Sequence, residues 1–500
     1  MYDNVHDSLV AHHSYASHLP QRLDMVVSEY CDAAPWKCAH GMRDAGEKGA
    51  VIEGMGGEEL VLYNGQDCRL TGLAWERMQP DLDRERWVYE HDLKLTRLCH
   101  EMQWEGIGVD VGRKAELEGL LEARKEGLRA EICALIGEPD FAPSKHAEVR
   151  RVLFRVFKAR GVKQTSTGLL STDDETLESL QGDDTSLSRF AAAILRWRLA
   201  DKVLSTYLTK AKVNAKTGRC HYNWKPFGTV SGRLASRLQS CPRWDGSKAE
   251  GRVREIYVPR PGNVFVYYDV SQAEMRLAAY LAADPVFMKV ANGSDVHAGN
   301  AGAVFPDIAA KGWLEGKAKS DPLKGKPYRD IAKNLGFAIA YGAEEERVFS
   351  TLRRKGFNVT MRAVGLILAR LRASYKVYYN FVEANVERVR REGFMRSPVL
   401  GRIRWFGWYP KPTEISNYPV QSALADIVNM RMIALAPRMA PLKSFLVAQI
   451  HDACIYDVPR EEAERVEELI REEWSKPVPL AGGNLVLPID LKRGERWSEL

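Results

Sequence analysis

Cysteine, long apolar runs and unbalanced charge are all scarce in this sequence. Eight cysteines among 500 residues are too few for a disulfide-stapled framework, so we expect reduced thiols and a cytoplasmic location. No run of about 18 apolar residues occurs, which argues against a membrane span. The N-terminal stretch lacks a basic region followed by an apolar one, so we expect no secretory signal.

The composition is that of a globular protein with several domains. Hydrophobic residues make up 45% and charged residues 28%, which excludes a disordered tail and a collagen-like rod. At roughly 150 residues per domain, a chain of this length corresponds to about three domains. The net charge of +6, from 72 basic and 66 acidic residues, does not by itself indicate a polyanionic partner. It leaves room for local basic surfaces beside local carboxylate sites.

Hydrophobic periodicity divides the chain into a largely helical first part and a mixed second part. Residues 1–85 are rich in loop-forming residues, and we expect them to be loop-rich. Over 84–135 and 185–208, apolar residues recur at helical spacing. From Val264 onward, strand patterns alternate with helix patterns, and residues 460–474 are predicted to form a charged amphipathic helix.

Two aspartates stand where predicted strands end. The strand pattern VFVYYDV ends close to Asp269, while SFLVAQI and ACIYDV are separated by His451 and Asp452, the spacing of a two-residue hairpin. Taken alone, each Asp is more often a turn or cap residue. If the hairpin pairs beside the first strand, the two carboxylates meet and form hard oxygen ligands that suit Mg²⁺. Two such ions can activate a hydroxyl and stabilise a leaving pyrophosphate.

Ser271 and Glu274 follow Asp269 with the spacing S-x-x-E at the start of a predicted helix. The simplest interpretation of this pair is a capping box, in which the Glu side chain reaches back to a free backbone N–H group. A role for Glu274 in a binding site is the alternative.

A further segment carries four residues at intervals of four: Arg329, Lys333, Phe337 and Tyr341. On an α-helix they form one stripe with two cations at its start and two aromatic rings at its end. A nucleoside triphosphate matches this order, because its phosphates carry charge at one end and its base offers a π-face at the other. A core stripe with two snorkelling cations is the alternative.

Two segments are basic. Residues 229–244 hold Arg233, Arg237, Gln239 and Arg243 among small residues, and residues 145–163 hold seven Lys or Arg side chains. Arg and Gln can donate hydrogen bonds to phosphates or to minor-groove acceptors. A solvated loop or helix face is the alternative for both segments.

These segments occur in an order that resembles family A DNA polymerases, of the DNA polymerase I type. The family's motif A, DYSQIELR, is similar to DVSQAEMR at 269–276. Motif B, RxxxKxxxFGxxYG, is similar to RDIAKNLGFAIAYG at 329–342, and motif C, QVHDE, to QIHDA at 449–453. The departures are Val270 for a frequent Tyr, Gly336 for a frequent Asn, and Ala453 for a Glu.

Three weaker motifs extend the resemblance to about residues 86–500. SGRLASRLQSCP at 231–242 is similar to the family's TGR…LQ…P segment and is short, as in phage-type members. Arg198, Lys202 and the following STY match a thumb pattern. NYPVQSALADI at 417–427 is similar to the segment that follows the fingers.

The resemblance implies an α+β multidomain fold shaped like a right hand, with a helical thumb, an antiparallel-sheet palm and helical fingers. The expected divisions are a partial exonuclease-like segment over 1–85, the thumb over 86–228, the palm over 229–275 and 399–500, and the fingers over 276–398. The implied activity is template-directed addition of dNTPs to a primer 3′-OH in DNA replication. Two Mg²⁺ ions, for which Mn²⁺ can substitute, are the implied cofactors, and primer–template DNA and dNTPs are the implied partners.

The resemblance also implies a role for individual residues. It assigns the metal ions to Asp269, Asp452 and the backbone carbonyl of Val270, and catalysis to the same two aspartates and Lys333. It assigns the incoming nucleotide to Arg329, Lys333, Phe337, Tyr341, Glu274, Gln272 and His297, with Glu274 crowding the 2′ position. It assigns DNA binding to Arg233, Gln239, Arg254, Asn417, Gln421, Gln449, His451 and Lys202.

Residues 1–85 resemble only the later part of the family's 3′→5′ exonuclease domain. Tyr63 and Asp67 have the Y-x3-D spacing of the third exonuclease motif, but no D-x-E occurs in residues 1–62. The segment is therefore a remnant, a truncation or one part of a split enzyme. We expect no exonuclease activity from this chain alone, and we expect a partner that is either a separate chain completing the domain or a processivity factor.

Two other functions compete with the polymerase hypothesis. One is an RNA-making or reverse-transcribing enzyme with the same palm, and the other is a DNA-binding accessory protein without catalysis. Glu274 and Tyr341 argue against the first, while the presence of Asp269, Lys333 and Asp452 argues against the second. For a phage-encoded enzyme, the expected location is the host cytoplasm.

Overall fold

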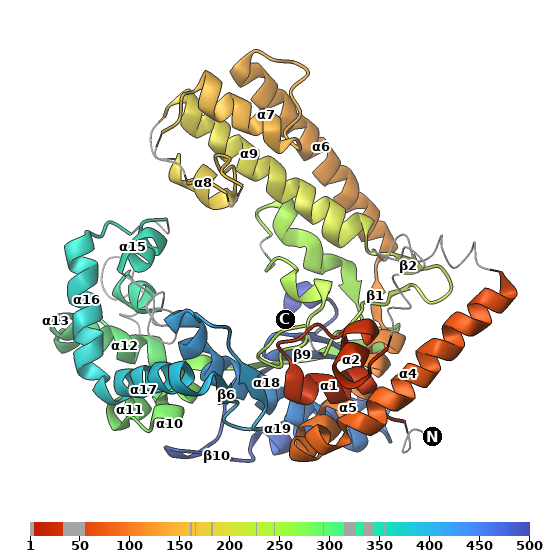
Figure 1. The fold of residues 1–500 in the computed structure, drawn as a ribbon. Coiled ribbons are helices and arrows are strands. Elements are labelled where there is room, and N and C mark those ends of the chain that lie inside the picture. The colour runs from red at the N-terminus through yellow and green to blue at the C-terminus, as the bar shows by residue number, and fades with distance from the viewer. Residues whose placement is uncertain are drawn as a thin grey trace.

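The computed structural model describes most of the chain as helices arranged around antiparallel sheets (Figure 1). The described residues are 5–33, 56–160, 163–165, 167–181, 184–226, 228–244, 246–293, 295–314, 327–333, 345–354 and 357–500. No helix within these ranges is long and apolar enough to cross a membrane. Seven of the cysteines lie in the described ranges, and all seven are free thiols.

A four-stranded antiparallel sheet occupies the centre of the molecule. Its order is β12 (Ile489–Gly494), β5 (Asn263–Val270), β9 (Ala453–Pro459) and β8 (Phe445–Ile450). Ile450 pairs with Ala453, so His451 and Asp452 form the two-residue turn of the β8–β9 hairpin, as the sequence predicts. Every residue of β9 is buried, which shows that the sheet is covered on both faces.

Four helices cover this sheet and supply its core. They are α5 (Arg86–Glu105), α10 (Ala273–Ala282), α18 (Pro412–Met439) and α19 (Ala463–Trp474), the last preceded by η7 (Arg460–Glu462). α19 packs on β5, β9 and β12, while α5 packs on β8 and on α18. The shared core includes Phe265, Tyr268, Leu277, Ile427 and Ile455. The predicted helices after Asp269 and over 460–474 are confirmed.

A helical arm projects away from the sheet at the top of Figure 1. It consists of α6 (Val111–Ile136), α7 (His146–Arg151), η2 (Val152–Val156), α8 (Asp174–Ser179), α9 (Ser186–Val203) and η3 (Leu204–Thr209). The helix predicted over 185–208 is thus present as α9 and η3. The arm has its own core, which includes Ile132, Phe141 and Phe190. In the basic segment 145–163, Arg151 pairs with Glu138, and Lys163 pairs with Asp173 at 2.8 Å, which favours a solvated face.

Short strands connect the arm to the central sheet. A second antiparallel sheet has the order β2 (Val213–Asn214), β3 (Arg219–Cys220), β1 (Ile107–Val109) and β4 (Tyr257–Val258). The short helices η4 (Arg237–Ser240), η5 (Ala249–Ile256) and η8 (Trp497–Glu499) lie in the connecting and C-terminal segments. Two hairpins complete the strands: β6 (Phe394–Arg396) with β7 (Ile403–Trp405), and β10 (Val478–Leu480) with β11 (Gly483–Leu485).

A second group of helices lies at the left of Figure 1, on the other side of the central sheet from the N-terminal helices. Its members are α11 (Pro285–Ala291), α12 (Val296–Val304), α13 (Pro306–Ala310), α15 (Glu345–Arg354), α16 (Met361–Ser374) and α17 (Lys376–Glu392). The rings of Phe287 and Tyr375 stack at 4.5 Å and join α11 to the start of α17.

The described parts of the N-terminal segment, residues 5–33 and 56–85, are mostly helical, so the prediction of a loop-rich segment is wrong for these residues. It contains α1 (Ser8–Ala16), α2 (Leu23–Tyr30) and the long α4 (Gly57–Arg84). Leu70, Ala74, Met78 and Leu82 of α4 recur every four residues and are all buried. This stripe stabilises the helix by tertiary packing on α1, α2 and α5, which outweighs the glycines and polar residues on the exposed face.

Candidate active site

Asp269 and Asp452 are brought together by strand pairing. Asp269 is the penultimate residue of β5 and stands opposite Ala453 of β9, the residue that follows Asp452 in the hairpin turn. Both aspartates are partly buried. Burial, together with the negative charges of Asp452 and Asp490, raises the pKa of Asp269 to about 6. Burial and Glu274 likewise raise the pKa of Asp452.

Asp490 is a carboxylate that the sequence analysis missed. It lies on β12 directly opposite Asp269, so the two side chains leave the sheet on the same face. Its position depends on the pairing of the C-terminal strand with β5, and the alternation in IDLKRG is the only sequence signal for that strand.

The donor set fits a hard, hydrated cation. In the described ranges, no group of three or more His, Cys, Asp or Glu side chains is arranged to enclose a metal ion. Asp269 and Asp452 instead offer carboxylate oxygens at an open strand end, with Asp490 beside them. Mg²⁺ suits such a site because it retains waters and completes its shell with phosphate oxygens. An enclosing Zn²⁺ site would need more protein ligands than these.

The two turns next to the aspartates have strained backbones. Gln272 has φ 53° and His451 has φ 61°, and they are two of four non-glycine residues with positive φ in the described part of the chain. Such conformations are uncommon for residues with a side chain, and they cluster at functional sites. Gln272 is held in place because its Oε1 accepts a hydrogen bond from Val296 N at 2.9 Å.

A cavity of about 430 Å³ opens beside Asp452. The residues around it come from the β8–β9 turn, the start of α10, the start of α12 and the helical segment 327–333. They are Arg233, Arg243, Gln272, Ala273, Glu274, Met275, His297, Lys333, His451 and Asp452. Three permanent cations therefore face two carboxylates around a space large enough for a nucleotide-sized anion.

Glu274 lies on this cavity and forms no capping box. The N-cap residue of α10 is Gln272, and no side chain caps the helix there. Glu274 Oε1 instead accepts a hydrogen bond from Arg233 Nη2 at 2.8 Å. The capping-box interpretation of Ser271 and Glu274 is therefore wrong, because the strained Gln272 turn begins the helix one residue after Ser271.

Only some of the residues predicted to contact the triphosphate line this cavity. Lys333 is exposed and lines the cavity together with His297, whose pKa is lowered by burial and by the charge of Arg329. Arg329 does not line the cavity, because its Nε donates to Asp295 Oδ2 at 2.9 Å. Phe337 and Tyr341 lie outside the described residues.

Comparison with known proteins identifies the family. The profile of DNA polymerase family A matches residues 113–499, which is most of the chain. The chain belongs to DNA polymerase family A. This confirms the predicted resemblance to family A DNA polymerases.

Individual relatives agree with this assignment. The chain is 28% identical over 471 residues to the thermostable DNA polymerase I of Thermus thermophilus, covering 91% of this chain and 51% of the relative. It is 26% identical over 477 residues to DNA polymerase I of Synechocystis sp., covering 87% of this chain and 45% of the relative. The chain thus spans about half the length of these curated relatives.

A solved structure shows the same fold. The POL domain of Pol1 from M. smegmatis, in complex with DNA primer-template and dNTP, matches with a TM-score of 0.77 at 21% identity. The match covers 98% of this chain and 81% of that chain. The right-hand architecture predicted for a family A polymerase is confirmed. In the predicted division of the chain, which stays a prediction, the central sheet corresponds to the palm, the α6–α9 arm to the thumb and the α11–α17 group to the fingers.

The residues predicted to bind DNA in this family A chain lie around the palm. Gln239 Nε2 donates to Gln449 Oε1 at 2.8 Å, and Gln449 in turn donates to the carbonyl of His451. Asn417 and Gln421 are half-buried on α18, where Asn417 Oδ1 has no hydrogen-bond partner. The Gln239–Gln449–His451 contacts thus connect η4 with the β8–β9 hairpin.

Two other predicted DNA contacts differ from this group. Lys202 is exposed on α9 of the thumb. Arg254 Nε donates to the carbonyl of Pro242 at 2.9 Å, and its guanidinium stacks 4.4 Å from the centre of the Trp497 ring. Burial lowers the pKa of Arg254, and these two contacts occupy its side chain.

A basic cavity at the base of the thumb is a second feature that the sequence analysis missed. Its volume is about 700 Å³, and its lining contains Lys210, Lys212, Lys225, Arg237 and His221. Among the described residues that line it, none is acidic. The recurring lysines in TKAKVNAK are the sequence signal, but only the fold brings Lys225 and Arg237 to them.

Proposed function

We propose that this chain is a template-directed DNA polymerase that adds dNTPs to a primer 3′-OH during DNA replication. The observation that supports this most directly is the pairing of β5 with the β8–β9 hairpin. It unites Asp269 and Asp452 from two distant motifs beside a cavity lined by Lys333, Arg243 and Arg233.

In this proposal, Asp269 and Asp452 hold two Mg²⁺ ions, for which Mn²⁺ can substitute, with help from the carbonyl of Val270. When bound, such ions activate the attacking hydroxyl and stabilise the departing pyrophosphate. The chain's own contribution is to hold two carboxylates at a fixed strand end. Asp490 adds negative charge on the opposite side of Asp269 and thereby strengthens the attraction for cations.

The cationic side of the cavity would receive the triphosphate. Lys333 and His297 already line it, and Arg329 would join them once a phosphate competes with Asp295 for its guanidinium. Gln272 and the pair of Arg233 and Glu274 lie where the sugar and the primer end would stand. Phe337 and Tyr341 are proposed to face the incoming nucleotide on the family resemblance alone.

The duplex would lie between the palm and the thumb. Arg233, Gln239, Asn417, Gln421, Gln449 and His451 are the proposed contacts near the primer terminus, and Lys202 and Arg254 remain proposed from the resemblance. The basic cavity around Lys210, Lys212, Lys225 and Arg237 would bind backbone phosphates, because the charged side chains in its lining are cations and favour a polyanion.

Several predictions made from the sequence stay predictions. They are the domain divisions at 85, 228, 275 and 398, the cytoplasmic location, the phage origin and the partner chain or processivity factor. In the exonuclease-like segment, Tyr63 and Asp67 lie one turn apart on α4, and Tyr63 is hydrogen-bonded to Asp67. The absence of exonuclease activity from this chain alone stays an expectation as well.

Primer extension with Asp269→Asn and Asp452→Asn tests the proposal. Each change keeps the shape of the side chain but removes a charged metal ligand, so nucleotide addition should fall by at least about a thousandfold, equivalent to roughly 4 kcal/mol of barrier. Binding of primer–template DNA should persist. Asp307→Asn, an exposed change on α13, is the matched control and should extend primers like the parent.

The same assay separates the competing functions. Extension by the parent with NTPs in preference to dNTPs would favour the RNA-making alternative. DNA binding without extension would favour the accessory protein. Extension by either Asn variant within about tenfold of the parent would refute the two-metal assignment.

A further inference from the structure

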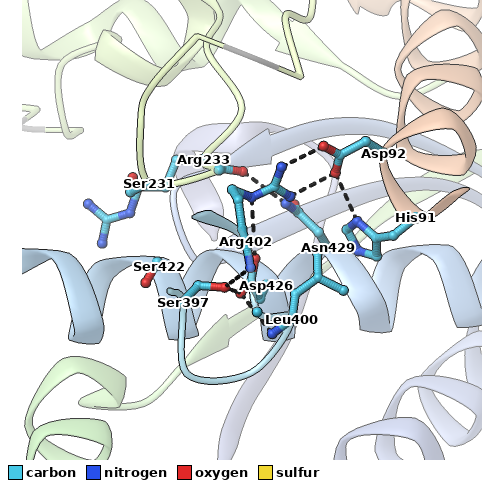
Figure 2. Close-up of polar contacts among 12 residues, drawn as sticks. His91, Asp92, Ser231, Arg233, Ser397, Leu400, Arg402, Ser422, Asp426 and Asn429 are labelled. Carbon is cyan, nitrogen blue, oxygen red and sulfur yellow. Dashed lines mark hydrogen bonds and ion pairs between the residues drawn. The ribbon is translucent and has the colours of Figure 1, made fainter. Parts of the chain in front are cut away.

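A buried charge network lies behind the candidate active site, outside the residues discussed so far (Figure 2). The guanidinium of Arg402 is fully buried and binds both oxygens of Asp92 on α5, with Nη2 donating to Asp92 Oδ1 at 2.7 Å. Burial alone would raise the pKa of Asp92, but Arg402 holds it well below its usual range. Both groups are therefore charged in the folded protein.

Asp426 of α18 completes the network from the other side. Its Oδ2 accepts hydrogen bonds from Ser397 Oγ at 2.6 Å and from Leu400 N at 3.1 Å. Ser397 Oγ also accepts from Arg402 N at 2.9 Å, so the turn between β6 and β7 is clamped onto α18. Figure 2 shows Arg402 between Asp92 and Asp426, and its Nε lies 3.9 Å from Asp426 Oδ1.

The backbone of Gly232 lies directly on this pair. Its φ is +81°, and a Cβ atom there would be 3.1 Å from Arg402 Nε and 3.6 Å from Asp426 Oδ1. One turn along α18 from Asp426, Asn429 Nδ2 donates to the carbonyl of Gly232 at 3.0 Å. The network thus contacts the loop at a position where any side chain would be strained and would press on Arg402.

The next residue in this loop is Arg233, which binds Glu274 at 2.8 Å in the cavity. A continuous set of contacts therefore runs from Asp92 and Arg402, through Gly232, to the Arg233–Glu274 pair. A buried ion pair is weak evidence for stability, because desolvation of both charges offsets much of their attraction. A role in fixing geometry accounts better for its placement beneath this loop.

We propose that Arg402 and Asn429 are positioning residues that fix Gly232 and so hold Arg233 and Glu274 where Glu274 excludes a 2′-hydroxyl. The inference rests on the proposed polymerase function and deepens it, because it assigns sugar selectivity to contacts beyond the cavity wall. Loosening the loop lets Glu274 move and admits ribonucleotides. The chemical step with dNTPs depends on Asp269 and Asp452 and changes less.

Asn429→Leu is the variant that tests this inference. It keeps the branched shape of the parent side chain, leaves Asp92, Arg402 and Asp426 unchanged, and removes the hydrogen bond to Gly232. Selectivity, measured as kcat/KM for a dNTP over that for the matching rNTP in primer extension, should fall roughly tenfold, the worth of one ordinary hydrogen bond. The fall should come mainly from improved use of the rNTP.

Two further variants make the result specific. Gly232→Ala acts on the same loop from its other side and should also lower selectivity, which keeps the test valid if Asn429→Leu does not fold. Leu435→Ala removes buried apolar volume further along α18 and should lower the melting temperature while leaving selectivity at the parent value. A purely structural role for the network would make all three variants behave alike.

Glu274→Ala separates failure of this inference from failure of the proposed function. It should relax selectivity at least as much as Asn429→Leu. If it does so while Asn429→Leu and Gly232→Ala retain parent selectivity, the positioning role is overturned and the gate stands. If Glu274→Ala leaves selectivity unchanged, the gate and the positioning role both fail. A parent that extends no primer overturns the polymerase function itself.

Discussion

Replacing Asp269 with Asn should stabilise the metal-free protein even though it abolishes catalysis. Asp269 is partly buried between Asp490, directly opposite on β12, and Asp452 in the hairpin turn. Burial and these two charges raise its pKa to about 6. An Asp in an unfolded chain has a pKa of about 3.9. The folded protein therefore holds a proton that the unfolded chain has already released as the pH rises above about 4.

The sign of the effect follows from this difference. Ionisation costs folding free energy as the pH rises from about 4 to about 6, and the full cost persists above pH 6. The difference of about two pKa units, at about 1.4 kcal/mol per unit, sets an upper limit near 3 kcal/mol on the folding free energy that this ionisation costs. Because water reaches part of the carboxyl group and screens it, about 1–2 kcal/mol is a realistic value. A neutral Asn side chain escapes this cost.

Thermal unfolding in EDTA at pH 8 and pH 4.5 measures the effect. For cooperative unfolding of 500 residues, 1 kcal/mol corresponds to about 1 °C, so Asp269→Asn should unfold about 1–2 °C above the parent at pH 8. The difference should shrink by more than half at pH 4.5. Adding Mg²⁺ should raise the melting temperature of the parent more than that of the variant, because a ligand of the folded state stabilises it by mass action.

Asp307→Asn, on the exposed surface of α13, controls for the loss of one negative charge and should change none of these values. If the parent were the more stable protein at pH 8 in EDTA, the repulsion at the strand end would be absent. The reasoning that Asp269 is held there at a cost, for the sake of a cation, would then be wrong.

Two other predictions concern buried and exposed charge. Asp92→Asn leaves Arg402 buried without its charge partner and should lower the free energy of unfolding by about 3–5 kcal/mol in urea titrations; a loss under 1 kcal/mol would contradict the described pairing. The double variant Lys210→Gln and Lys212→Gln should weaken DNA binding, and the slope of log association constant against log salt concentration should become about 2 less steep. Lys311→Gln, on the exposed surface beyond α13, should change neither value. An unchanged slope would exclude the basic cavity from the path of the DNA.

The sequence predicts the centre of the fold well because local patterns determine it. The alternation in VFVYYDV and the two-residue spacing at His451 and Asp452 define β5 and the hairpin without tertiary information. The meeting of Asp269 with Asp452 follows once these strands pair. The helical thumb is predicted for the same reason, since α6 and α9 carry their apolar residues at helical spacing.

Features that depend on distant partners could not be predicted in this way. Asp92 and Arg402 lie 310 residues apart, and neither stands in a motif that suggests a partner. The helix α4 escapes detection because its buried stripe is narrow and its exposed face is rich in glycine and polar residues. Glu274 fits a capping box by spacing, and only the left-handed turn at Gln272 shows that the box is not formed.

The register of the central sheet also gives a physical reason for the departure at Ala453. In the sheet, Asp269 has two directly opposite neighbours, Ala453 on β9 and Asp490 on β12. Like charges directly opposite each other on antiparallel strands are destabilising. With Asp490 already on one side, a Glu at position 453 would place like charges on both sides of a carboxylate whose pKa is already raised to about 6. Ala453 limits this repulsion to one side, so Asp269 can still ionise near neutral pH and bind a cation.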